Sequence, residues 1–178
     1  MIKAIECRYA GRKFRSRREA RWAVLFDHLD LDWVYESEGY VLDDDTCYLP
    51  DFELRLPSKT RIWVEVKPEL ENYEPLSLLV KGSNRSGCLV AEPMTRCDVL
   101  LCSAPTGNFQ QTPLKYWLTT TTGKSNLEIQ AASNAALSAR WEHGETPRRP
   151  RRPGGRSPRG YTRSETLLNE QQATFGGW

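Results

Sequence analysis

The sequence predicts an α/β fold in which helices flank a mixed central β-sheet. Three observations predict it: an amphipathic stripe of helical period, two segments of alternating apolar and polar residues, and two short apolar runs after them. Half-buried strands alternate with period 2, helices repeat every 3.6 residues, and continuous short apolar runs are typical of fully buried strands. The chain has 178 residues, of which 39% are hydrophobic, enough for one domain of ordinary size.

The first helix is expected from Ser16 to about Asp30. Its buried stripe consists of Trp22, Leu25, Phe26 and Leu29, which follow the i, i+3, i+4, i+7 spacing. Ser16 and Glu19 have the spacing of a capping box, in which both side chains accept hydrogen bonds from first-turn amides. Glu19 also falls within the apolar stripe, so a place in an internal site is the alternative to simple capping.

Three strands are expected next, at residues 32–42, 48–56 and 61–67. In the second and third, alternation separates an apolar face from a face rich in ionisable groups. The apolar side chains are those of Tyr48, Pro50, Phe52, Leu54, Leu56, Ile62, Val64 and Val66. The opposite face carries Leu49, Asp51, Glu53, Arg55, Trp63, Glu65 and Lys67. A solvated hairpin face is the simplest interpretation of this second set.

The register of this hairpin determines which charged groups meet. Both apolar faces must lie on the same side, which allows two registers. A connection of three residues places Asp51 opposite Glu65, whereas a connection of five places it opposite Lys67. Opposed Cβ atoms lie about 4.5–5.5 Å apart, and like charges at that distance destabilise a sheet. The hairpin therefore requires a cation, either Lys67 or a metal such as Mg²⁺, which prefers carboxylate oxygens.

Beyond the hairpin, the sequence predicts two more helices, three strands and a tail. The helices are expected at 75–82 and 126–143, and the strands at 88–91, 97–103 and 114–118. Residues 147–160 contain six Arg, four Pro and three Gly, a composition that cannot bury a core. We therefore expect a folded domain at 1–146 and a disordered basic tail at 147–178.

The distribution of charge suits a protein that binds a polyanion and a divalent cation. Residues 1–26 contain eight basic and two acidic residues, and residues 27–75 contain fourteen acidic and four basic ones. Solvated surfaces are the alternative interpretation, and the Asp43–Asp45 run is expected to be a solvated turn.

Several classes of protein are excluded. Five cysteines without a Cys-x-x-Cys pair, together with two histidines, argue against a disulfide framework, a zinc ribbon or a histidine metal motif. No apolar run is long enough for a membrane span, and no signal peptide is evident, so a cytoplasmic protein is expected.

The motif residues resemble a known superfamily. Pro50-Asp51 followed by Glu65-Val66-Lys67 resembles the PD-(D/E)xK motif of the restriction-endonuclease-like nucleases, and the order of helix, hairpin, helix and strand matches their core. Residues 14–23, 48–52 and 63–67 also look like small uncharacterised proteins of phages and mobile elements. The resemblance covers about residues 5–105, less clearly to 146, and departs at Pro68, where those relatives often have glycine.

The resemblance implies a Mg²⁺-dependent (endo)deoxyribonuclease of phage or mobile-element DNA processing in a bacterial host cytoplasm, with Mn²⁺ as a substitute cofactor. The implied catalytic residues are Glu19, Asp51, Glu65 and Lys67, and the implied metal ligands are Asp51, Glu65 and the backbone carbonyl of Val66. Phosphate contacts are expected from Arg12, Lys13, Arg15, Arg17 and Arg18. The alternative is a non-catalytic nucleic-acid-binding or assembly protein that keeps the nuclease fold. A homodimer or a larger complex is open in both cases.

Overall fold

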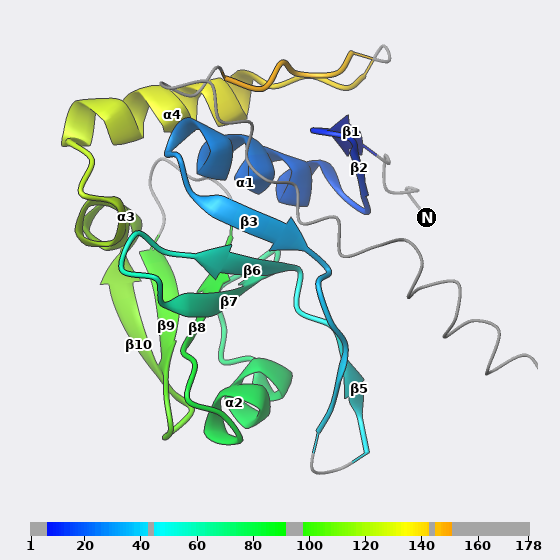
Figure 1. Ribbon diagram of the computed structural model, residues 1–178, viewed down its shortest axis with the longest axis vertical. Helices are drawn as coiled ribbons and strands as arrows, with labels where there is room; N and C mark the ends of the chain where they lie inside the picture. The colour runs from blue at the N-terminus through cyan, green and yellow to red at the C-terminus, as the bar shows by residue number, and fades with distance from the viewer. Residues whose placement is uncertain (1–6, 43–44, 92–97, 143–144, 151–178) are drawn as a thin grey trace, which may run out of the picture.

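The protein is an α/β fold built on a mixed six-stranded sheet, as the sequence predicts (Figure 1). The computed structural model describes residues 7–42, 45–91, 98–142 and 145–150. The strand order is β10-β9-β8-β7-β6-β3; β7 and β8 are parallel, and the other neighbours are antiparallel. The strands are β3 (Asp32–Tyr35), β6 (Phe52–Arg55), β7 (Arg61–Val66), β8 (Gly87–Val90), β9 (Asp98–Ser103) and β10 (Asn108–Pro113).

The helices cover both faces of this sheet (Figure 1). Within the described residues they are α1 (Arg17–His28), α2 (Glu74–Lys81), α3 (Leu114–Thr122) and α4 (Asn126–Ser138). Helix α4 packs on α1, and α1 packs over the face that holds Phe52, Leu54 and Val64. Helix α2 covers the opposite face, where Trp63 and Leu89 are buried with its side chains. The sheet therefore has a core on each side.

The larger core is centred on Phe52, the residue that follows Asp51. Its ring lies 5.3–6.1 Å, centroid to centroid, from those of Phe14, Phe26, Trp33 and Tyr35. These rings come from β2 (Arg12–Phe14), α1 and β3, so this cluster holds the start of β6 against the helix. Aromatic pairs at such distances add to the free energy of burial.

Two small hairpins flank the main sheet. Strands β1 (Cys7–Tyr9) and β2 (Arg12–Phe14) pair through a turn in which Ala10 and Gly11 both have positive φ, the geometry of a type I′ turn. Strands β4 (Tyr40–Val41) and β5 (Cys47–Tyr48) pair to form a second hairpin, which we call the arm. The arm projects from the sheet beside α2 (Figure 1). Of the Asp43–Asp45 run at its tip, residues 43–44 lie outside the described residues.

The strands predicted at 32–42 and 48–56 are each interrupted, and this corrects the sequence prediction. Residues 32–42 divide into β3 and β4, and residues 48–56 divide into β5 and β6, so each segment contributes to two different sheets. The second interruption contains Pro50, which has no amide hydrogen to donate to a sheet. Asp51 consequently lies between two strands rather than within one.

The strand predicted at 114–118 is also wrong, because these residues begin α3. Leu114, Trp117 and Leu118 are buried at the helical spacing i, i+3, i+4, which five residues are too few to distinguish from a strand. The residues directly before this helix form a strand, β10, that is not among the elements predicted from the sequence. The other predicted elements are confirmed within one or two residues, except that α4 ends at Ser138.

The chain from residue 147 to 150 lies against the core. Arg149 forms a bidentate ion pair with the buried carboxylate of Asp27, one of whose contacts is 2.8 Å. Residues 151–178, most of the predicted tail, lie outside the described residues. In the described part of the chain, no helix is long and apolar enough to cross a membrane.

Candidate functional site

The register of the central hairpin brings Asp51 beside Glu65. Phe52 pairs with Val64 and Arg55 with Arg61, which is the register of the three-residue connection. Lys59 adopts a positive φ in that connection, and Leu56 donates its N–H to Thr60 at 2.8 Å. The alternative register, with Asp51 opposite Lys67, is thereby excluded.

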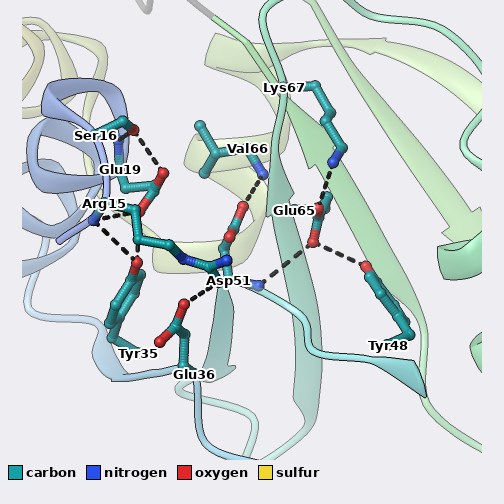
Figure 2. Close-up of polar contacts among 10 residues, drawn as sticks. All are labelled: Arg15, Ser16, Glu19, Tyr35, Glu36, Tyr48, Asp51, Glu65, Val66 and Lys67. Atoms are coloured by element: carbon teal, nitrogen blue, oxygen red, sulfur yellow. Dashed lines mark hydrogen bonds and ion pairs between the residues drawn. The ribbon is translucent and has the colours of Figure 1, made fainter. Parts of the chain in front are cut away.

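Asp51 occupies the position at which β6 stops pairing with β7. Trp63 and Lys67 donate their N–H groups to main-chain oxygens on the β8 side, so the N–H of Val66 faces β6. That N–H donates to Oδ2 of Asp51 at 2.8 Å (Figure 2). The carboxylate thus replaces a main-chain acceptor at the end of the ladder, and this bond determines where Asp51 points.

Both oxygens of Glu65 are engaged by neighbouring groups (Figure 2). Oε1 lies 2.8 Å from Nζ of Lys67. Oε2 accepts the hydroxyl of Tyr48 at 2.9 Å and the N–H of Asp51 at 3.4 Å. Burial, followed by the charge of Glu65, raises the pKa of Tyr48, so this hydroxyl keeps its proton and acts as a donor.

Lys67 remains a cation in this setting. Burial lowers its pKa, but the hydrogen bond and the charge of Glu65 outweigh that effect, and the pKa is raised. Its Nζ also lies 4.0 Å from the centre of the Tyr73 ring, a favourable cation–π distance. Lys67, one of the two cations that could neutralise the hairpin, is therefore paired with Glu65.

Glu19 lies inside the protein at the N-terminus of α1, and both interpretations of it find support. Its carboxylate accepts the hydroxyls of Ser16 and Tyr35, each at 2.6 Å, and the N–H of Arg15 at 3.2 Å. Ser16 accepts the N–H of Glu19, as predicted, but the Glu19 carboxylate accepts the N–H of Arg15, which precedes the cap, so the capping box is only half formed. The charge of Glu19 is also close enough to contribute to the raised pKa of Asp51.

The pKa of Asp51 is raised to about 7. The largest cause is burial and the second is the negative charge of Glu65, while the hydrogen bond from Val66 opposes both. Desolvation and a neighbouring like charge both favour the neutral form of a carboxyl group. Near neutral pH this group is therefore poised between its protonated and ionised states.

The face that carries Glu65 is buried, which corrects the expectation of a polar hairpin face. Only 8% of Asp51 and 4% of Glu65 are exposed, and Trp63, on the same face as Glu65, is equally inaccessible. The reason is α2, whose apolar side chains cover this side of β7. The interpretation as a solvated face is therefore wrong for this part of the hairpin.

The donor set fits a hard divalent cation through two carboxylates. Among the described residues, no donor is hydrogen-bonded to Oδ1 of Asp51, and Oε1 of Glu65 has only Lys67. Mg²⁺ typically takes one or two carboxylates together with water and phosphate oxygens. Across the described ranges, no group of three or more His, Cys, Asp or Glu residues is arranged to hold a metal. A cation here would therefore compete with Lys67 for Glu65.

The basic residues expected to contact phosphate differ in their surroundings. Arg12 and Lys13 are exposed on β2, beside the start of α1. Arg15 forms an ion pair with Glu36, and Arg17 forms one with Glu142 at 2.6 Å. Arg18 is half-buried. Arg12, Lys13, Arg15 and Arg17 are thus all exposed around the start of α1, and Arg15 and Arg17 are each paired with a carboxylate.

Sequence reasoning missed the tyrosines that hold the acidic groups. Tyr35 donates to Glu19 and Tyr48 donates to Glu65, yet strict alternation assigned Tyr48 to the apolar face opposite Glu65. The interruption before β6 resets that alternation. The signal that could have indicated it is Pro50, which disfavours a continuous paired strand.

Comparisons with known proteins give no independent indication of a family. No protein-family model matches the chain, and searches of curated proteins and of solved structures return no match either.

Proposed function

We propose that this protein is a Mg²⁺-dependent nuclease that hydrolyses phosphodiester bonds in DNA, in the processing of phage or mobile-element DNA. The observation that carries the proposal is the buried, adjacent pair of Asp51 and Glu65, with Lys67 bonded to Glu65. Burying neighbouring carboxylates is unfavourable for folding, and groups with perturbed pKa values cluster at functional sites. The PD-(D/E)xK resemblance of these three residues supports the same chemistry.

The proposed roles follow from the contacts of each side chain. Asp51 and Glu65, with the Val66 carbonyl as a third ligand, would hold a divalent cation, which would supply an activated water and neutralise charge on the phosphate. Lys67, which is cationic, donates to the charge that develops on the phosphate or orients the attacking water. Glu19 adds negative charge near Asp51. By the resemblance, it would hold a metal-bound water or a second ion.

Binding of the substrate backbone is assigned to the basic residues near α1. Arg12 and Lys13 are exposed and lie beside the helix that carries Glu19. Exposed cations of this kind provide affinity for phosphates without reading the base sequence. The arginine-rich residues after 147 would add further affinity of the same kind.

The second candidate function is a nucleic-acid-binding or assembly protein without turnover. It is favoured by the ion pair between Lys67 and Glu65, which already neutralises one of the two proposed ligands. In that case Lys67 would be a structural counter-ion, and Mg²⁺ would bind weakly.

A cleavage assay separates the two candidates. Purified full-length protein is incubated with labelled linear, circular and branched DNA, with and without Mg²⁺, beside Asp51→Asn and a control, Lys59→Ala, which changes an exposed lysine in the same hairpin. Mg²⁺-dependent cleavage by wild type and Lys59→Ala, lost in Asp51→Asn, supports the nuclease. DNA binding without cleavage by any form supports the alternative.

A further inference from the structure

Tyr48 connects the arm to the candidate metal site. It ends β5, which belongs to the arm and not to the six-stranded sheet, and its hydroxyl donates to Oε2 of Glu65 in β7 at 2.9 Å (Figure 2). The side chain is 6% exposed, and its ring lies edge-on to that of Tyr73 at 5.9 Å. A hydroxyl buried in this way has no water to replace Glu65, so the bond restricts both side chains.

The same bond determines which oxygen of Glu65 is open to a cation. Each carboxylate oxygen offers about two lone-pair positions. Oε2 uses both, for the hydroxyl of Tyr48 and the N–H of Asp51. Oε1 has only the contact with Lys67, so one of its positions is open. Tyr48 thereby orients Glu65 with Oε1, rather than Oε2, available for a ligand.

The arm is a small unit that pairs within itself and not with the main sheet. Tyr40 pairs with Tyr48 and Val41 with Cys47, and Leu42 donates its N–H to Thr46 at 2.9 Å. Its inner face is held by Tyr40, whose hydroxyl accepts the indole N–H of Trp63 at 3.3 Å, and by the buried Leu42. Its outer face is exposed, since Val41 is 70% accessible. A two-stranded hairpin is only marginally stable by itself, so the position of the arm depends on the contacts that Tyr40, Leu42 and Tyr48 make with the rest of the protein.

We propose that Tyr48 is a positioning residue that couples the arm to metal binding: with the arm packed, its hydroxyl holds Glu65 in the orientation that binds the cation. This inference rests on the proposed function. Hydrogen-bond partners of metal ligands typically account for a 10- to 100-fold difference in metal affinity. Because coupling between two sites is reciprocal, bound metal also stabilises the packed arm.

The test compares two tyrosine variants of the full-length protein. Tyr48→Phe removes the hydroxyl that reaches Glu65 and keeps the ring, whereas the control, Tyr116→Phe, removes the hydroxyl of a tyrosine on α3 that is 64% exposed. Mg²⁺ affinity is measured by calorimetric titration without DNA. Hydrogen exchange of the amides at 40–42 and 46–48 is measured with and without Mg²⁺, and melting temperatures verify that both variants fold.

We expect Tyr48→Phe to weaken Mg²⁺ binding about 10- to 100-fold and to abolish the protection of the arm by Mg²⁺. Tyr116→Phe should bind Mg²⁺ within about twofold of wild type. If wild type binds Mg²⁺ and Tyr48→Phe binds it equally well, the positioning role is overturned while the nuclease proposal stands. If wild type binds no Mg²⁺ or Mn²⁺, both are overturned. If Tyr48→Phe does not fold, a crystal structure of wild type with Mn²⁺ tests the proposal instead. A cation bonded to Oε2 of Glu65 in that structure would overturn it.

Discussion

The carboxylate of Asp51 accepts the main-chain N–H of Val66 at 2.8 Å, at the point where β6 and β7 stop pairing. This bond makes the side chain part of the end of the sheet and holds it beside Glu65. It also means that substitutions of Asp51 affect folding as well as chemistry. Asparagine keeps a carbonyl oxygen for Val66, whereas alanine leaves a buried N–H without an acceptor, at a cost of about 1–3 kcal/mol.

Asp51 should make the stability of the metal-free protein fall as the pH rises. Its pKa is raised from 3.8 to about 7 in the folded protein. Between those values the unfolded chain has lost the proton and the folded protein still holds it, so the free energy of unfolding decreases with pH and levels off above about 7. Each unit corresponds to about 1.4 kcal/mol, so the change is a few kcal/mol.

The measurement is the free energy of unfolding of wild type and Asp51→Asn in chelator, from pH 4 to 8. The variant should gain on wild type across this range, because its amide does not titrate. Parallel curves for the two proteins would show that the Asp51 pKa is not raised.

Substitutions of Lys67 and of Asp51 should differ in their effect on Mg²⁺ affinity, although both should lower the cleavage rate. Lys67→Ala should lower cleavage by at least about 100-fold, the loss typical of removing one group that stabilises transition-state charge, while Mg²⁺ still binds. Asp51→Asn should lose both cleavage and metal affinity, because one of two carboxylate ligands is gone. Single-turnover cleavage and Mg²⁺ titration distinguish them. Cleavage at the wild-type rate by Lys67→Ala would remove this residue from the mechanism.

Lys67→Ala should also destabilise the metal-free protein by about 1–3 kcal/mol, because the buried Oε1 of Glu65 loses its donor. Added Mg²⁺ should restore part of this loss. Lys59→Ala, in the exposed connection, should melt within a degree or two of wild type and serves as the control.

Glu19 substitutions should separate capping from chemistry. Glu19→Gln keeps an acceptor for Tyr35 and Arg15 but removes the charge beside Asp51, so cleavage should fall while the fold survives. Glu19→Ala should in addition lose about 0.5–2 kcal/mol of stability, as other cap removals do. Cleavage rates and melting temperatures of the two variants distinguish a role in the chemistry from a role in capping. Unchanged cleavage by Glu19→Gln would leave Glu19 with capping alone.

Two truncations should differ because Arg149 pairs with Asp27. A chain ending at Pro150 should keep the wild-type melting temperature but bind DNA more weakly, with a flatter salt dependence, because five arginines are gone. A chain ending at Thr146 also removes Arg149, the cation that contacts both oxygens of the buried Asp27 carboxylate. It should lose up to about 3–5 kcal/mol. Equal melting temperatures would show that the Arg149 contact contributes nothing to stability.

The sequence by itself determined the elements whose signal is local. The cap at Ser16 and the apolar stripe of α1 depend on residues within three or four positions of one another, and the structure confirms both. The parity of the hairpin limited Asp51 to two partners, because a shift by one residue would turn every apolar side chain outward. The three-residue connection, which places Asp51 opposite Glu65, was one of two registers that the sequence allowed, and no local pattern distinguished it from the other.

The tertiary structure alone decided which surfaces are covered and which distant groups meet. Burial of the Glu65 face depends on α2. The hydroxyl of Tyr48 reaches Glu65 because the strand is interrupted before β6, which lets the arm pack beside Trp63. Likewise, Leu114–Leu118 is a helix because it packs on the existing core, not because five residues define a period. Local patterns encode the direction of side chains, whereas the burial of a charge depends on contacts that the pattern does not contain.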